Sequence, residues 1–240
     1  MQRSNIRAVF LDAGDTLFTE RVSRSAIYAE IASGFGGSCD EEEMRSAMDA
    51  VFRDLPNSVE GHFRYSLPWF RAFNERVLDS CGVQAARFAA AHTALAERFE
   101  DPATYSVFDE VPEVLVELAG RGVQVGVVSN WSEHLPELLQ GLGLAETLDF
   151  VVTSADLRAE KPDRAIFERA LFRAGAAAEE SVHVGDHLER DVRGALNAGM
   201  RAILVDRDNG AGGDHEGVPV IGDLRGVLEL LDTQTNAVRS

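Results

Sequence analysis

The chain has 240 residues, 45% of them hydrophobic, and a formal net charge of −17 from 23 basic and 40 acidic side chains. Its length suits one large domain or a core domain with an insert, and so acidic a surface argues against nucleic acid and anionic membranes as partners because it repels their phosphates. Neither a signal peptide nor a run of roughly 20 apolar residues is evident, so we expect a cytoplasmic protein that does not span a membrane.

The first predicted element is a strand over residues 8–11, an apolar run with the sequence Ala-Val-Phe-Leu. The run is too short for a typical helix and suits a buried strand. Asp12 follows it directly, and the next residues, 13–16, form a turn-rich stretch.

A helical pattern without any convincing strand extends over residues 23–99. Its clearest stripe has the spacing i, i+4, i+7, i+8 and i+11 and consists of Met44, Met48, Val51, Phe52 and Leu55. Breaks between helices are expected at Gly36-Gly37, Pro56-Asn57 and Gly82. We therefore predict a four-helix unit whose Met and Phe stripes form its own core.

Four candidate substrate contacts and both cysteines fall within this helical segment. The candidate contacts are His62, Arg64, Tyr65 and Trp69. The tyrosine and the tryptophan lie near apolar helix positions and are expected to be structural. Cys39 and Cys81 show neither the spacing of metal ligands nor a disulfide framework, so we expect both to pack as small apolar residues.

In the remaining part of the chain, short apolar strands alternate with helices. Strands are predicted over residues 123–128, 150–153, 181–184, 202–205 and 218–221, and helices over residues 111–120, 133–140, 162–174, 191–198 and 224–231. Pro162 is expected at the first position of its helix, and the Gly- and acid-rich stretch 208–217 as a surface loop. Alternating strands and helices indicate a parallel sheet covered on both faces. We therefore predict an α/β fold with a Rossmann-like core, residues 1–17 and 104–240, and a helical cap, residues 18–103.

Polar side chains occur where the predicted strands end. Asp12 and Ser129 directly follow apolar strands, and Asp186 follows another after a single glycine. Lys161 lies past a fourth strand, and it is the single lysine among the 23 basic residues. A lysine is a compact point charge that arginine does not replace in a confined site. Because ligands bind at the carboxyl ends of strands in open α/β sheets, we expect these side chains to converge at one rim.

The converging residue types suit the transfer of a phosphoryl group. Two carboxylates from different strands, Asp12 and Asp186, form a hard oxygen site of the kind that Mg²⁺ prefers. Asp12 can also act as a nucleophile and form an aspartyl-phosphate. Ser129, Asn130 and the following backbone amides can hold phosphate oxygens at a helix start, while Lys161 neutralises charge.

Four segments resemble, in order, the motifs of the haloacid dehalogenase superfamily. They are residues 9–17 (Val-Phe-Leu-Asp-Ala-Gly-Asp-Thr-Leu), residues 127–130 (Val-Val-Ser-Asn), Lys161-Pro162 and residues 184–191 (Val-Gly-Asp-His-Leu-Glu-Arg-Asp). The resemblance spans nearly the whole chain, and the helical insert resembles the C1-type cap of that family. It implies a phosphatase-like hydrolase that uses Mg²⁺ and acts on a small phosphorylated metabolite, as a monomer or a homodimer.

The resemblance also implies a role for individual residues. The metal site would consist of Asp12, the backbone carbonyl of Gly14, Asp186 and Asp191, the last acting through water or Lys161. The phosphate site would consist of Thr16, Ser129, Asn130 and Lys161. Asp12 would be both nucleophile and metal ligand, and Thr16 a hydrogen-bonding residue beside it.

The nucleophile motif departs from the family pattern at one position. Phosphatases of the family have a second Asp two residues after the nucleophile, where it protonates the leaving alkoxide and then activates water. Gly14 stands there in this chain. It retains a carbonyl for the metal but lacks a general acid–base group, which typically contributes about 10²–10⁴-fold. Either Asp15 or a cap residue replaces that group in part, or the leaving group needs little protonation; the alternative role of Asp15 is that of a turn residue.

Two other functions remain open on the same scaffold. A 2-haloacid dehalogenase expels a halide without a proton donor and so tolerates Gly14, but it needs no metal, whereas Asp186 with Asp191 resembles a metal pair. A non-catalytic phosphate- or metabolite-binding protein also tolerates Gly14; a receiver domain of this kind is disfavoured by the long helical insert. The absence of a Gly-x-Gly-x-x-Gly after the first strand argues against a dinucleotide-binding oxidoreductase.

Overall fold

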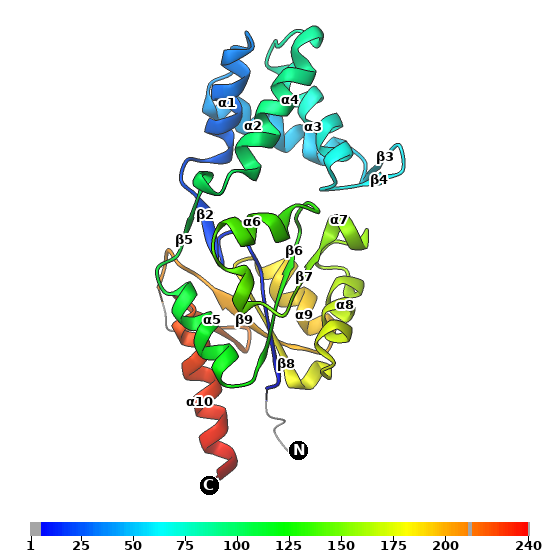
Figure 1. The fold of residues 1–240 in the computed structure, drawn as a ribbon. Helices are drawn as coiled ribbons and strands as arrows, with labels where there is room; N and C mark the ends of the chain where they lie inside the picture. Colours follow the sequence, from blue (N-terminus) through cyan, green and yellow to red (C-terminus); the bar gives the residue numbers. More distant parts are fainter. Residues whose placement is uncertain (1–5, 211–212, 240) are drawn as a thin grey trace. The chain divides into compact units, whose positions relative to one another are not determined.

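In the computed structural model, which describes residues 6–210 and 213–239, a mainly parallel sheet forms the core (Figure 1). The strands of this sheet, in spatial order β10-β11-β9-β8-β1-β6-β7, are β10 (Gly213–His215), β11 (Val218–Ile221), β9 (Arg201–Val205), β8 (Ser181–Gly185), β1 (Ala8–Leu11), β6 (Gln124–Ser129) and β7 (Phe150–Thr153). Neighbouring strands run parallel except for β10 and β11. The predicted α/β fold class is confirmed.

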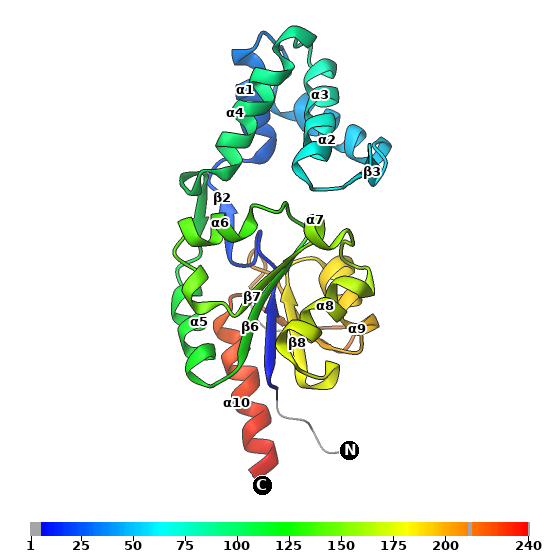
Figure 2. The same ribbon diagram turned by 45° about the vertical axis from the view of Figure 1, so that its right-hand side comes forward.

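Helices cover both faces of the sheet. The longer ones in this part of the chain are α5 (Val111–Gly120), α8 (Arg164–Ala174) and α10 (Arg225–Arg239), and the short ones are α7 (Ser154–Leu157) and α9 (Gly194–Asn197). Figures 1 and 2 show α8 and α9 on one face and α5 and α10 on the other. This arrangement explains why the strands are apolar throughout rather than alternating.

Strand β1 lies in the middle of the sheet, paired with β6 on one side and β8 on the other. All of its side chains are fully buried. Phe10 packs with Phe167 of α8 in one apolar cluster, whereas Val9 and Leu11 point to the opposite face because successive side chains of a strand alternate. The end of β1 is therefore held rigidly from both faces.

Several predicted elements differ from the structure, and the helix predicted over residues 224–231 extends to Arg239 as α10. Helix α8 begins at Arg164 rather than at Pro162, because the Asp163 carboxylate accepts a hydrogen bond from the Ala165 amide (2.9 Å) and caps the helix. The helix predicted from residue 191 begins earlier, as a π-helical turn over Leu188–Arg193. The stretch 208–217 was expected to be a loop but contains β10; its residues 211 and 212 lie outside the described residues.

The chain divides into two compact units, which are described separately. One contains the residues up to Thr19, Val107–Asn130 and the residues from Leu142 onward, and the other contains Glu20–Ser106 and Trp131–Gly141. The second unit thus includes α6 (Leu135–Gly141) in addition to the inserted segment. A two-stranded ribbon of β2 (Phe18–Glu20) and β5 (Tyr105–Val107) lies where the chain passes from one unit to the other and back.

The second unit contains four long helices around its own apolar core. They are α1 (Arg24–Gly34), α2 (Glu41–Asp54), α3 (Leu67–Ser80) and α4 (Phe88–Glu100). Side chains of Ser23, Asp40 and Ser66 cap the first three helices. Trp69 and Met44 are completely buried in the core, which places the predicted Met and Phe stripe inside the unit.

A hairpin of β3 (Ser58–Val59) and β4 (His62–Phe63) contradicts the expectation that this segment holds no strand. Its two turn residues, Glu60 and Gly61, both have positive φ angles, 49° and 81°. This is the backbone of a tight hairpin turn, for which Asn-Gly is the usual sequence signal. The Glu-Gly pair lacks that signal, so the hairpin was missed.

The two cysteines form a disulfide, which corrects the prediction that they are unpaired apolar residues. Cys81 is buried in the apolar core of the unit, as expected. Cys39 lies beside it, with 5.2 Å between the two Cα atoms, which is close enough for a disulfide. The Ser38 amide donates a hydrogen bond to the Cys81 carbonyl (2.9 Å). A Cβ atom at Gly37 would lie 3.1 Å from that same carbonyl oxygen, so the glycine permits the close approach.

Reduction of this disulfide is expected to lower the free energy of unfolding by about 4 kcal/mol, because linking residues 42 positions apart restricts the unfolded chain. Thermal denaturation with and without dithiothreitol would measure the loss, as a fall of about 10 °C in Tm. The double variant Cys39→Ala with Cys81→Ala should have the Tm of the reduced parent protein, whether or not dithiothreitol is present. Two titratable thiols in the folded, unreduced protein would contradict the expectation.

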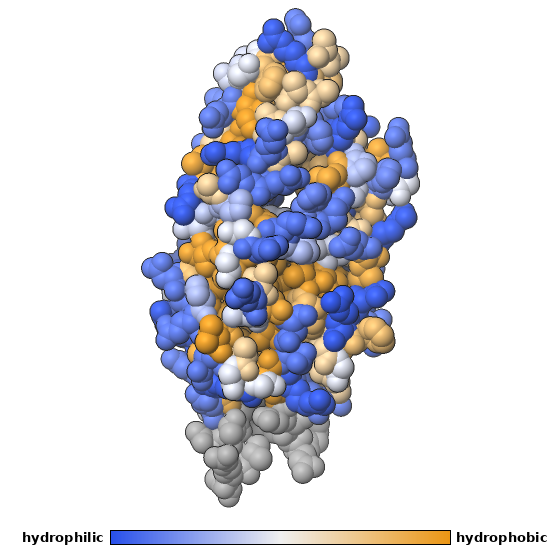
Figure 3. All heavy atoms as spheres, viewed as in Figure 1, coloured by the Kyte–Doolittle hydropathy of each residue, from blue (hydrophilic) through white to orange (hydrophobic). Residues whose placement is uncertain are grey.

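On the face drawn in Figure 3, hydrophilic residues are spread over both units, with apolar residues scattered between them. Within residues 6–210 and 213–239, no helix combines the length and the apolar character that crossing a bilayer requires.

Candidate active site

The predicted site residues of the first unit lie at the carboxyl ends of neighbouring strands. Asp12 directly follows β1, Ser129 is the last residue of β6, and Asp186 directly follows β8. Because β6 and β8 flank β1 and all three run parallel, their ends meet at the same edge of the sheet. The structure thus brings together residues that are far apart in the sequence.

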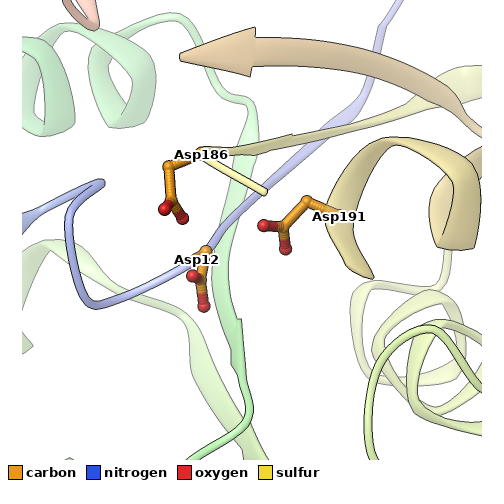
Figure 4. Close-up of side chains that lie close together, drawn as sticks. All are labelled: Asp12, Asp186 and Asp191. Atoms are coloured by element: carbon orange, nitrogen blue, oxygen red, sulfur yellow. The ribbon is translucent and has the colours of Figure 1, made fainter. Parts of the chain in front are cut away.

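Three carboxylates form a cluster at this edge. One oxygen atom from each of Asp12, Asp186 and Asp191 lies within 4.8 Å of the other two. Figure 4 shows the three side chains turned toward one another, from the ends of β1 and β8 and from the π-helical turn. An all-oxygen donor set of this kind fits a hard divalent cation such as Mg²⁺.

Gly185, the last residue of β8, makes the cluster possible. A Cβ atom at this position would lie only 2.3 Å from Cγ of Asp191. The carboxylate of Asp191 therefore occupies the space that any larger residue at position 185 would fill. This contact is the physical reason why a glycine precedes Asp186.

Lys161 lies between two of the carboxylates. Its ammonium nitrogen is 2.7 Å from Oδ1 of Asp12 and 2.5 Å from Oδ1 of Asp191, and the residue is only 3% exposed. Desolvation by itself would lower the pKa of Lys161, but the charges of Asp12 and Asp191 outweigh it and raise that pKa above its ordinary value. The side chain is therefore a fixed positive charge beside Asp12.

Asp191 is held by three donors, two of which the sequence analysis did not assign. Besides Lys161, the His187 amide donates to Oδ2 (3.0 Å), and Nε2 of His183 lies 2.9 Å from Oδ1. Because the carboxylate can only accept, His183 is the donor. Desolvation opposes ionisation of Asp191, but Lys161 and His183 lower its pKa below the ordinary value.

His183 could have been recognised from its place in a strand. It is completely buried in β8 and pairs with Phe10 of β1, so its side chain lies on the face of the sheet that α8 covers. There its ring makes an edge contact with Phe167, with 5.2 Å between the ring centres. A histidine flanked by valines in a buried strand needs a polar partner, but only the folded chain identifies Asp191 as that partner.

The cluster is short of positive charge. Three ionised carboxylates against one ammonium leave two negative charges, the amount that one divalent cation neutralises. Desolvation, together with the charges of Asp12 and Asp191, raises the pKa of Asp186 to about 7. Asp186 is accordingly the carboxylate whose charge the protein leaves least compensated.

Asn130 contacts the lysine backbone rather than remaining available as predicted for a phosphate. Its Oδ1 accepts from the Lys161 amide (2.7 Å), and its Nδ2 donates to the Lys161 carbonyl (3.1 Å). Both ends of the amide side chain thus hold Lys161 in place. Ser129 and Thr16 are both buried, and within the described part of the chain Oγ1 of Thr16 has no hydrogen-bond partner.

Asp15 lies in a tight turn outside the carboxylate cluster. Its φ of 56° is in the left-handed region, its amide donates to the Phe18 carbonyl (2.7 Å), and its Oδ1 accepts from Oγ1 of Thr19 (2.8 Å). These contacts are those of a turn residue. The exposed carboxylate is nevertheless close enough for its charge to contribute to the raised pKa of Asp186.

Replacement of the single lysine tests the electrostatic balance. Lys161→Met is expected to destabilise the metal-free protein by about 3–5 kcal/mol, because it leaves buried carboxylates without their counter-ion. Urea denaturation in EDTA would measure the loss, and Mg²⁺ should restore part of it in the variant. Lys161→Arg, which keeps the charge but not the shape, should lose less. Equal stability of Lys161→Met and the parent protein in EDTA would contradict this account.

The fold and the site together define an α/β protein that gathers acidic residues and a lysine at the carboxyl edge of its sheet. Comparison with known proteins gives the family. Residues 69–205 match the model of the family described as haloacid dehalogenase-like hydrolase. The haloacid dehalogenase-like hydrolase domain-containing protein 3 of Danio rerio is 32% identical over 213 residues, which cover 87% of this chain and 88% of the relative.

Two further similarities also extend over most of the chain. A phosphoserine phosphatase of Thermus thermophilus is 31% identical over 222 residues, 84% of this chain and 89% of the relative. A solved structure of a 2-haloacid dehalogenase from Pseudomonas syringae is 27% identical, with a TM-score of 0.70 over 95% of this chain and 99% of that one. The chain belongs to the haloacid dehalogenase-like hydrolase family, as the four motifs indicated.

Proposed function

We propose that the protein is a Mg²⁺-dependent phosphatase that hydrolyses a small phosphomonoester through an aspartyl-phosphate at Asp12. The main support is the surroundings of Asp12, where a buried ammonium lies 2.7 Å from its carboxylate within a cluster of three acids. A nucleophile that must approach a phosphate dianion needs such compensating charge, because carboxylate and phosphate otherwise repel each other. The similarity to a phosphoserine phosphatase also supports this reaction class.

The reaction has two displacements at phosphorus. A carboxylate oxygen of Asp12 attacks the phosphoryl group, the bond from phosphorus to the ester oxygen breaks, and the alkoxide leaves. Water then attacks the same phosphorus atom, releases inorganic phosphate and regenerates the carboxylate. Lys161 stabilises the charge that collects between the nucleophile and the phosphoryl oxygens, while Asn130 keeps the lysine in place.

The carboxylate cluster would hold the metal ion. Asp12 and Asp186 would be direct ligands, with the carbonyl of Gly14, and Asp191 would act through water or through its contact with Lys161. When bound, Mg²⁺ would supply the positive charge that the cluster lacks and orient the phosphoryl group. Ser129 and Thr16 would contribute hydroxyl groups to the phosphate.

Proton transfer to the leaving group distinguishes the possible substrates. Gly14 offers no side chain, and the carboxylate of Asp15 is engaged with Thr19 in a turn. Phosphate esters whose leaving group is a weak base are therefore the favoured substrates, unless a cap residue or Asp15 donates the proton. Asp15 stays a candidate because its charge reaches Asp186, whose pKa it helps to raise.

The second candidate function is 2-haloacid dehalogenation. It is favoured by Gly14, since a halide leaves without a proton, and by the similarity to the Pseudomonas syringae dehalogenase. In that reaction the Asp12 carboxylate would displace the halide from carbon, and water would hydrolyse the resulting ester. The carboxylate cluster argues against it, because this chemistry requires no metal ion.

A single set of assays separates these functions. Phosphate release from p-nitrophenyl phosphate, sugar phosphates and nucleotides is measured with Mg²⁺ and with EDTA, and chloride release from 2-chloropropionate under the same two conditions. We expect Mg²⁺-dependent phosphate release that Asp12→Asn abolishes. Chloride release that persists in EDTA would establish the dehalogenase, and no turnover above Asp12→Asn on any compound would favour a binding protein.

A further inference from the structure

The loop that carries the nucleophile is held by an arginine that follows a strand two positions away in the sheet. Arg207 follows β9, which is separated from β1 by β8. Its Nη2 donates to the carbonyl of Thr16 (2.6 Å), and its Nε donates to the carbonyl of Asp15 (3.2 Å). One guanidinium thus binds two consecutive peptide carbonyls just after Asp12.

The position of the guanidinium is itself determined by two other groups. Nη2 of Arg207 lies 2.8 Å from Oε1 of Glu110, a carboxylate that is buried and that also accepts from the Leu224 amide at 3.3 Å. The Phe108 ring lies against the guanidinium, with 3.5 Å between its centre and Cζ of Arg207. An ion pair on one edge and a ring against the planar face leave the arginine little freedom.

The loop turns sharply at Asp15. Asp15 adopts a φ of 56°, which residues with a side chain rarely do. The hydrogen bonds within the loop, from the amides of Leu17 to Ala13 and of Asp15 to Phe18, form around this residue. Binding of the Asp15 and Thr16 carbonyls by Arg207 fixes the orientation of these two peptides, which follow Gly14 directly.

We propose that Arg207 is a positioning residue for the nucleophile loop, residues 12–16, and that Glu110 orients Arg207 for this role. The inference rests on the proposed function, because it concerns the reaction at Asp12. The groups that Arg207 contacts, two loop carbonyls, Glu110 and Phe108, do not belong to the carboxylate cluster. Arg207 acts through the peptide backbone, and Arg is suited to it because its planar fork reaches two carbonyls and a carboxylate together, whereas the ammonium of a lysine cannot match that geometry.

The experiment compares Arg207→Ala, Arg207→Lys and Glu110→Gln with Arg225→Ala as control. Arg225 is an exposed arginine paired with Asp223. Its replacement makes the same chemical change as Arg207→Ala but removes no contact with the nucleophile loop. The first readout is hydrogen exchange of the amides of Asp15, Leu17 and Phe18, which requires no turnover. We expect at least tenfold faster exchange in Arg207→Ala and an intermediate effect in Glu110→Gln, with unchanged exchange in α8.

The second readout is steady-state hydrolysis of p-nitrophenyl phosphate as a function of Mg²⁺. A loosened nucleophile loop should lower kcat roughly 100-fold and raise the half-saturating Mg²⁺ concentration, since small misplacements of a reacting group have effects of this size. Millimolar guanidinium chloride should restore activity to Arg207→Ala but not improve Arg225→Ala. Arg207→Lys should stay closer to Arg207→Ala than to the parent protein, because it restores the charge without the fork.

These outcomes keep the positioning role separate from the proposed reaction. If the parent protein hydrolyses no phosphate ester, the proposed function fails while the exchange rates still test the loop. Unchanged exchange and unchanged kcat in Arg207→Ala would overturn the positioning role even if the protein proves to be a phosphatase. Should Arg207→Ala not fold, Arg207→Lys and Glu110→Gln carry the same comparison, and parent-like values in both would overturn it.

Discussion

Asp12→Asn is expected to lower kcat for phosphate-ester hydrolysis by roughly 10⁴–10⁶-fold, the scale seen when a covalent nucleophile is removed. The amide has nearly the shape of the carboxylate but lacks the charge that makes it a nucleophile, so no aspartyl-phosphate can form. Its ion pair with Lys161 is lost as well, which weakens the hold on the lysine.

Stability should not explain this loss of activity. In the absence of metal, the substitution removes one of three clustered carboxylates and so relieves repulsion with Asp186. We therefore expect a Tm in EDTA close to that of the parent protein, together with a smaller shift on adding Mg²⁺. Rapid acid quenching of a reaction with labelled phosphate ester should trap a phosphoprotein in the parent but none in the variant.

A matched substitution provides the control. Asp40→Asn makes the same chemical change at the N-terminal cap of α2, where asparagine also caps well. It should hydrolyse phosphate esters at the parental rate. Activity of Asp12→Asn within tenfold of the parent protein would rule out Asp12 as the nucleophile.

Gly14→Asp is expected to increase kcat/KM for alkyl phosphates by about 10²–10⁴-fold, the usual contribution of a general acid–base group. An alkoxide is a strong base and leaves slowly unless it is protonated, so a carboxyl group at this position acts where it is most needed. The φ angle of Gly14 is not positive, and an aspartate therefore meets no left-handed strain there. Aryl phosphates, whose leaving groups need little protonation, should gain much less.

The measurement is the dependence of kcat/KM on the pKa of the leaving group. In the parent protein the rate should fall steeply as that pKa rises, whereas in Gly14→Asp the dependence should be shallow. Gly14→Asn, which adds the same bulk without a proton, should retain the steep dependence. A shallow dependence in the parent protein would mean that another group already donates the proton.

In that case the proton donor would be Asp15 or a cap residue. Asp15→Asn keeps the size of the side chain and suits the left-handed φ of 56°, since asparagine adopts that conformation readily. If hydrolysis of alkyl phosphates were unchanged in Asp15→Asn, Asp15 would be excluded as the donor, and a cap residue would remain.

Most of the parallel sheet was predictable because its strands are short apolar runs that end in a glycine or a polar residue. The strands at residues 8–11, 150–153 and 218–221 have the predicted bounds. Elements with weak local signals were missed, namely the Glu-Gly hairpin of β3 and β4 and the strand β10. Their formation depends on a partner strand more than on their own residue types.

The sequence by itself determined which residues could carry the chemistry: an aspartate after the first strand, a single lysine, and a glycine where a proton donor is usual in the family it resembles. These signals are local, since they depend on residue type and on the nearest strand. Only the tertiary structure decided the partners, because contacts between distant segments follow from the topology of the chain. The disulfide, the hold of Asn130 on the Lys161 backbone, the donor His183 and the arginine behind the nucleophile loop are all contacts of this second kind.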